Sequence, residues 1–511
     1  MTAESVLKEK VSFGDRINPI VIKELRQAVQ SRFVISMLLT LLAVQLVAIG
    51  IYILASGASL FSFDAGRQSF LMLFGILQVI GTVFVPLYTG ARLAAERSDI
   101  NVDLLFITTI KPRSVIAGKM FAAMTLTALI YSACMPFMAF TYFLRGIDLP
   151  SIFISLAIGF VAVVACAQVA VFVALIPVNR AFKVIFGLVA LVIFGIAYFA
   201  TMGGVSSLVN YGVGGTGFRQ TMIAMSVVIC FLVGLFFVMS VALIKPVASN
   251  RALPVRLFIT AAWLLTGVAA VADGMIEDSS VPLILWLVGF EIVFALSLFA
   301  AVSERDRPGR RVLRSIPKSL FGRARAFFFF SGAANGVAWA SVMIVLTLAA
   351  AWVWVKSFPR HGNASDLVDS AKWMGGMCLY FFCYAMTGAL LRRLLFSRVG
   401  SELIWLIGVS LLLVGSVTPF MIGYIIFFND QWWSEDLGAW WVGSPFAWGN
   451  KGHRVLYASV GGLWAVLVVA MSLPWIIERV KMFKHPSRVA ADDTIESAPR
   501  VVTTLFSTND E

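Results

Sequence analysis

Charge is the scarcest feature of this sequence. Only 13% of its 511 residues are Asp, Glu, Lys or Arg, whereas 60% are hydrophobic and the mean hydropathy is +0.90. Soluble domains carry about 25% charged residues, so the composition excludes a water-soluble enzyme. The apolar residues occur in runs of about 20, the length with which one helix crosses a hydrocarbon core. The sequence therefore predicts an all-α integral membrane protein, a polytopic helical bundle.

Cysteine and histidine are also rare. The five cysteines fall within apolar runs, and the three histidines are scattered. Neither residue type forms a cluster with the spacing of metal ligands. The sequence therefore predicts structural cysteines, no metal site and no cofactor bound by this chain.

Nucleotide-hydrolysing motifs are missing. The only candidate for a phosphate-binding loop is Gly118-Lys119, which has Arg113 where the upstream glycine belongs and Met120 where a serine or threonine would ligate magnesium. We find no catalytic motif of a protease or hydrolase either. The chain is therefore not expected to be an enzyme by itself.

Twelve membrane-spanning helices are predicted from hydropathy. They lie near residues 33–55, 70–91, 120–144, 151–178, 182–202, 221–244, 255–272, 281–302, 337–355, 373–395, 403–428 and 455–477. Most of the 40 Lys and Arg residues fall on the side of the N-terminus, which predicts that both termini are cytoplasmic. Topology and anionic lipid explain the net charge of +13, so no nucleic-acid partner is expected.

Residues 17–32, before the first span, predict an amphipathic helix lying on the membrane surface. Asn18 is a favourable N-cap and Pro19 suits the first helical position. Apolar residues recur at helical spacing opposite Lys23, Arg26 and Gln27. The alternative is a basic flank that only fixes topology.

The segment 95–119, after the second span, combines a polar start with a short apolar patch at 102–110. Such a patch is too short to span a membrane and favours contact with a partner. The alternative is an amphipathic loop that rests on the bilayer.

These two segments resemble the permease subunits of the type-2 ABC-transporter family. The resemblance rests on Asn18-Pro19 followed by Lys23-Glu24-Leu25-Arg26-Gln27, and on Glu96-Arg97, Asp103-Leu104-Leu105-Phe106-Ile107-Thr108 and Gly118-Lys119. It covers about residues 15–145. The remaining spans exceed the six usual for one permease domain, so the second half is transport machinery, a degenerate repeat or an accessory domain.

The resemblance implies a division of labour between two subunits. Lys23, Glu24 and Arg26 would lie on the interface helix, and the coupling loop would hold Glu96, Asp103, Leu104, Thr108 and Lys119. Both would contact a separately encoded ATP-binding subunit, which would hold ATP and Mg²⁺. It further implies a homodimer or heterodimer of permeases in a prokaryotic cytoplasmic (inner) membrane, and an exporter.

Four polar side chains fall inside predicted spans. Glu291 is the most costly of them, because a charged carboxylate is expensive in hydrocarbon and marks a functional site or a buried partner. Gln45, Gln78 and Gln168 are expected to hydrogen-bond neighbouring helices. For Glu291 a substrate or proton role and a structural hydrogen bond both remain open.

The domain organisation follows from charge and hydropathy. We expect a permease-like membrane domain at 1–302, a basic cytoplasmic linker at 303–336, a second membrane region of about four helices at 337–478 and a disordered cytoplasmic tail at 479–511. Trp432, Trp433, Trp440, Trp441 and Trp448 are expected to form an aromatic belt at the outer interface, with a lid over a ligand as the alternative.

Two rival functions stay open beside the ABC permease. A secondary transporter driven by an ion gradient also has twelve spans with both ends inside, and Glu291 would then be its coupling carboxylate. A non-transporting scaffold that anchors a membrane complex is the third hypothesis.

Overall fold

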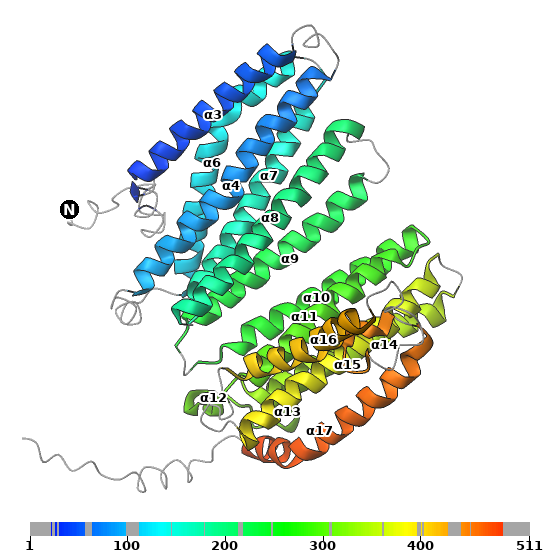
Figure 1. Cartoon of the computed structure of the whole chain (residues 1–511). Helices are drawn as coiled ribbons and strands as arrows, with labels where there is room; N and C mark the ends of the chain where they lie inside the picture. The colour runs from blue at the N-terminus through cyan, green and yellow to red at the C-terminus, as the bar shows by residue number, and fades with distance from the viewer. Residues whose placement is uncertain are drawn as a thin grey trace, which may run out of the picture. The chain divides into compact units, whose positions relative to one another are not determined.

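The helical architecture is visible throughout the part of the chain that the structure, a computed structural model, describes (Figure 1). That part comprises residues 22, 26–27, 30–56, 64–98, 112–144, 146–177, 179–212, 218–246, 249–305, 309–359, 362–395, 400, 403–427, 441–449 and 451–483. Within these residues no strand is present, and the one β-bridge joins Ser279 to Gly362.

Eleven helices of this described part are long and apolar enough to cross a membrane. A further apolar helix, α16 (Ile404–Phe427), contains Pro419 and coincides with the predicted span at 403–428. Backbone groups have no water to bond in hydrocarbon, so every apolar run of this length folds as a helix. The prediction of an all-α polytopic membrane protein is confirmed.

The helices extend past the predicted spans at most ends, because hydropathy marks only the lipid-facing part of each one. The long helices are α3 (Arg32–Ser56), α4 (Ala65–Ser98), α6 (Pro112–Phe143), α7 (Leu149–Leu175), α8 (Arg180–Tyr211), α9 (Phe218–Ile244), α10 (Ala252–Ile276), α11 (Val281–Val302), α14 (Ala333–Ser357), α15 (Ala364–Leu394), α16 and α17 (Arg454–Met482).

The chain divides into two compact units, residues 1–246 and 247–511. The expected boundary at 302 differs from this division, because α11 packs against α14 and α15, and α10 packs against α11. Both helices therefore belong to the second unit. Basic residues mark the side of the membrane on which a loop lies and carry no information about which helices pack together.

In the first unit the core lies between α4, α6 and α7. Phe74 and Leu77 of α4 pack with Ile130 of α6 and Val163 of α7, and all four side chains are fully buried. Helix α7 also packs against α8 and α9. Asp148 caps α7 by accepting a hydrogen bond from the backbone N–H of Ser151 at 3.4 Å.

In the second unit α15 is the central helix, since it packs against α11, α14, α16 and α17. The segment expected to be a basic cytoplasmic linker, 303–336, contains helices α12 (Arg310–Arg314) and α13 (Leu320–Phe329) and the start of α14. Ile316 and Ala326 of this segment form a small buried cluster with Phe483. The segment is therefore packed against the helices that follow it.

A buried arginine fixes this segment to α10. The Arg256 guanidinium, 4% exposed, donates to Glu304 Oε1 at 2.5 Å and to the carbonyl oxygens of Phe328 and Phe330 at 3.1 and 2.5 Å. The other oxygen of Glu304 accepts from the N–H of Gly332 at 2.7 Å. Charge-assisted hydrogen bonds of this kind compensate for the burial of the charge.

The stretch before α17 lies inside the second unit. Residues 441–449 and 451–453, which we call the strap, contain the short helices η6 (Pro445–Gly449) and η7 (Lys451–His453). Trp441 and Trp448 are buried, at 8% and 7% exposure, so the aromatic-belt prediction is wrong for these two. Trp432, Trp433 and Trp440 lie outside the described residues, as does the predicted tail beyond Phe483.

Hydrogen bonds show how far the strap reaches along α15. Tyr380 donates to the carbonyl oxygen of Val442 at 2.7 Å, and Tyr384 donates to that of Gly443 at 2.7 Å. Tyr380 lies about 24 Å along α15 from Ala364, at a rise of about 1.5 Å per residue. The strap therefore meets α15 near the middle of that helix, where non-helical backbone is tolerated only when protein surrounds it.

Candidate functional site

Five of the predicted coupling residues lie outside the described residues: Lys23, Glu24, Asp103, Leu104 and Thr108. Arg26 is described as helical and exposed. Its carbonyl oxygen accepts from the backbone N–H of Gln30 at 3.1 Å, the i to i+4 bond of an α-helical turn. Helix α3 then begins at Arg32.

The other two coupling residues, Glu96 and Lys119, form an ion pair between the last turns of α4 and the first turns of α6. Lys119 Nζ lies 2.7 Å from Glu96 Oε2, with the lysine side chain 5% exposed and the carboxylate 40% exposed. A buried ammonium group is costly without such a partner. The pair therefore fixes the spacing of the two helices that flank residues 99–111.

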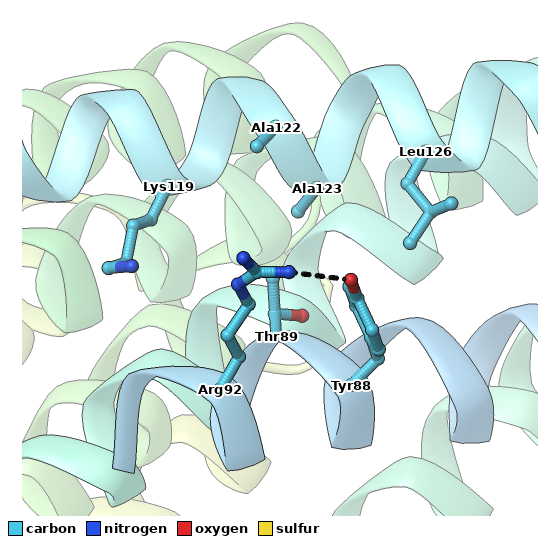
Figure 2. Close-up of a pocket in the computed structure, with 7 residues that line it drawn as sticks. All are labelled: Tyr88, Thr89, Arg92, Lys119, Ala122, Ala123 and Leu126. Carbon is cyan, nitrogen blue, oxygen red and sulfur yellow. Dashed lines mark hydrogen bonds between the residues drawn. The ribbon is translucent and has the colours of Figure 1, made fainter. Parts of the chain in front are cut away.

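A small pocket lies beside this pair (Figure 2). It is lined by Tyr88, Thr89, Arg92, Lys119, Ala122, Ala123 and Leu126. Arg92 donates to the Tyr88 hydroxyl at 2.8 Å and stacks over the Tyr88 ring at 5.9 Å. Figure 2 shows Arg92 on one of the two helices and Lys119 on the other, with both side chains extending into the space between these helices.

Gln27, from the segment before α3, joins the same cluster. Its side-chain oxygen accepts a hydrogen bond from Arg92. The structure thus brings Gln27, Arg92, Glu96 and Lys119 together at one end of the first unit. Sequence reasoning missed Arg92, although it lies four residues before Glu96 on one helix face, a spacing at which an arginine and a glutamate are neighbours.

The three glutamines in spans are buried between helices. Gln78 of α4 donates to the Gly159 carbonyl oxygen of α7 at 3.4 Å and accepts from the Tyr131 hydroxyl of α6 at 2.8 Å. Gln45 donates to the Leu73 carbonyl oxygen at 3.4 Å, and Gln168 donates to the Ser240 hydroxyl at 3.3 Å. Each glutamine therefore joins its own helix to a neighbour.

Glu291 is fully buried in α11, at 0% exposure. Its Oε2 atom lies 3.0 Å from the Cys378 sulfur of α15, and the same sulfur lies 3.6 Å from the Glu291 carbonyl oxygen. Among the described residues Oε1 has no hydrogen-bond partner. Cys378 was assigned a structural role from the sequence, and nothing in its local pattern identifies Glu291 as its neighbour.

Metal binding finds no support in this part of the chain. Within the described residues no group of three or more His, Cys, Asp or Glu side chains is placed to hold a metal ion.

The comparisons with known proteins give no match. No family model fits the chain, and neither a curated protein nor a solved structure is detectably similar to it. The architecture and the two polar sites described above therefore carry the functional argument, and the chain is a multi-pass membrane protein by the length and composition of its helices.

Proposed function

We propose that this chain is the membrane-spanning permease subunit of an ATP-driven ABC exporter in a prokaryotic cytoplasmic membrane. It works as a homodimer or heterodimer of permeases with a separately encoded ATP-binding subunit. The observation that supports the proposal is the cluster of Gln27, Arg92, Glu96 and Lys119 at one end of the first unit. It joins the segment before α3 to the two helices that flank residues 99–111.

Helix length supports a coupling role for this end. Helices α4 and α6 have 34 and 32 residues, whereas about 20 residues cross the hydrocarbon core. Both helices therefore extend beyond the bilayer. The Glu96–Lys119 ion pair holds the extended ends together, so that a force applied at residues 99–111 moves α4 and α6 as one body.

The proposal assigns ATP and Mg²⁺ to the partner subunit. Gly118 and Lys119 lie inside α6, where backbone N–H groups bond within the helix and cannot surround a phosphate. Lys119 is paired with Glu96. In this proposal Lys119 therefore couples the helices and does not bind nucleotide.

The first experiment is extraction of the tagged protein from its native membrane in a mild detergent, followed by mass spectrometry of the proteins that co-purify. A stoichiometric subunit with a phosphate-binding loop supports the proposal. Isolation of the chain with no ATPase contradicts it.

Charge reversal then tests the coupling pair. Glu96→Lys or Lys119→Glu alone is expected to lower partner-stimulated ATP hydrolysis by about tenfold or more, the effect of about 1.4 kcal/mol on the barrier. The double reversal restores the pair and is expected to recover most of the stimulation. The matched control is reversal of Asp64 and Arg67, an ion pair at 3.3 Å at the other end of α4. Equal losses at both ends would contradict a specific coupling role.

One observation favours a second candidate function, transport driven by an ion gradient. Glu291 is a fully buried carboxyl group within a predicted span, and such groups form ion or proton pathways in transporters. If flux is lost in Glu291→Gln while the protein stays folded, this second candidate is favoured over the ABC permease. A modest effect on flux favours the ABC permease.

A further inference from the structure

Glu291 lies far from both ends of its helix. It is close to the middle of α11, a helix of 22 residues, so about 15 Å of helix separates it from each end. The side chain has no exposed surface. Its protonation state must therefore be decided by the groups in direct contact with it.

No cation compensates for a charge on Glu291 within the described residues. The helices packed against α11 are α10, α14, α15 and α16, and the Asp, Lys and Arg side chains described on them lie in ion pairs, on the surface or near a helix end. Arg256 pairs with Glu304, Asp369 pairs with Lys451 and Arg454, and Asp273, Lys356, Asp366 and Lys372 are exposed. Arg392 and Arg393 are in the last turn of α15, about 20 Å along the helix from Cys378.

Among the described residues, Cys378 is the titratable side chain that hydrogen-bonds Glu291. An ionised carboxylate here would have one thiol hydrogen bond to Oε2 and none to Oε1. The cost of burying such a charge is several kcal/mol. An ionised Glu291 is therefore strongly disfavoured in this environment.

A neutral carboxyl group fits the same atoms. With a proton on Oε2, the O–H would donate to the Cys378 sulfur across the 3.0 Å that separates the two atoms, and the Cys378 S–H would donate to the Glu291 carbonyl oxygen across 3.6 Å. The atom left without a partner, Oε1, is then a neutral carbonyl oxygen, which is far less costly to bury than a charged one. Both hydrogen atoms have an acceptor.

We propose that Glu291 is a proton-binding site in the second unit, with its bound proton on Oε2 facing the Cys378 sulfur. The carboxylate takes up one proton from a hydronium ion of the solvent, which forms the O–H bond, removes the negative charge and leaves a neutral water molecule. This inference does not depend on the proposed coupling to an ATP-binding subunit.

Infrared difference spectroscopy on the purified full-length protein at neutral pH tests the proposal. The spectrum of the wild type minus that of Glu291→Gln is expected to contain the carbonyl stretch of a neutral carboxylic acid. Cys378→Ala is expected to shift that band, because the hydrogen-bond partner is removed. Loss of carboxylate bands alone in Glu291→Gln would overturn the proposal.

Glu96→Gln is the matched control. Glu96 is 40% exposed and paired with Lys119, so this substitution is expected to remove only carboxylate bands. If Glu96→Gln also removes a neutral-acid band, the Glu291 band is not specific evidence for a bound proton and the proposal fails.

A second measurement needs no variant and decides the case if Glu291→Gln does not fold. An apolar carbodiimide reacts with protonated carboxyl groups in apolar surroundings: the acid proton moves to a carbodiimide nitrogen, the carboxyl oxygen adds to the central carbon, and the adduct rearranges to a stable N-acylurea with no by-product. Mass spectrometry of labelled wild-type membranes is expected to find the adduct on Glu291. Its absence from Glu291, with labelling elsewhere in the chain, would overturn the proposal.

Discussion

The closest helix approach around Gln78 occurs at Gly159 of α7. A Cβ atom at this position would lie 2.6 Å from the Gln78 side-chain oxygen, 2.8 Å from the Tyr131 hydroxyl and 2.9 Å from the Phe74 ring. All three distances are shorter than van der Waals contact. Glycine is therefore required for the hydrogen bonds that join α4, α6 and α7.

We predict that Gly159→Ala destabilises the protein by about 1–3 kcal/mol, the usual cost of overpacking a core. Thermal unfolding in detergent is the measurement. Gly195→Ala on α8 is the control, because no atom lies within 4 Å of a Cβ built there. The control is expected to unfold at the wild-type temperature or slightly above it, since alanine favours a helix. An unchanged unfolding temperature for Gly159→Ala would contradict this packing.

Polar residues within apolar runs were identifiable from the sequence, whereas their partners were not. Gln45, Gln78, Gln168 and Glu291 each interrupt a hydrophobic segment, and that contrast alone marks them. Tyr131 and Cys378 do not stand out in this way, because tyrosine and cysteine are common in the apolar helices to which they belong. Their roles arise from contacts between helices far apart in the sequence, which one sequence does not specify.

At the level of elements, the strap is the feature that hydropathy does not predict. Its tryptophans match an interfacial aromatic belt, because such belts and buried helix packing both use large amphipathic rings. The contacts between α15 and the strap show that the described tryptophans of the strap are packed inside the second unit and do not form a belt at the membrane interface. The Trp448 ring lies directly against Gly376, so that a Cβ at this position would clash with the ring, and Arg454 donates to the Trp448 carbonyl oxygen at 3.1 Å.

The strap position predicts a difference in cysteine labelling. Ser444 is 4% exposed, whereas the Lys451 side chain is 73% exposed. In intact cells or sealed vesicles with the predicted outer side exposed, Ser444→Cys is expected to resist a membrane-impermeant maleimide and Lys451→Cys to react. Labelling of the wild-type protein measures the reaction of the native cysteines, and this amount is subtracted from the labelling of each variant. Equal, rapid labelling of both variants would mean that the strap lies on the surface.

For the whole molecule, the division between residues 246 and 247 predicts where the protein can be expressed as two separate fragments. Co-expressed fragments 1–246 and 247–511 each contain one of the two compact units whole. Fragments 1–302 and 303–511 separate α11 from α14 and α15. We predict that the first pair gives detergent-soluble, monodisperse protein in about wild-type yield and that the second pair aggregates. Size-exclusion chromatography measures both. Equal yields from the two pairs would contradict this division.

The spans could be predicted from the sequence because lipid imposes the same length and composition on every crossing helix. The predicted span 281–302 coincides with α11 at both ends. The grouping of helices could not be predicted, because helices in lipid associate through packing and hydrogen bonds. Each hydrophobic run is equally compatible with several neighbours.

The strap also has a consequence for biosynthesis. Helices α15 and α17 run in the same direction, since Tyr380, Cys383 and Thr387 meet Tyr457, Gly461 and Trp464 in that order. The strap and α17 are synthesised after α15 and α16, so Tyr380 and Tyr384 lack their acceptors Val442 and Gly443 until the strap itself has been synthesised. A chain truncated before residue 441 leaves these two hydroxyls without the acceptors that the strap supplies.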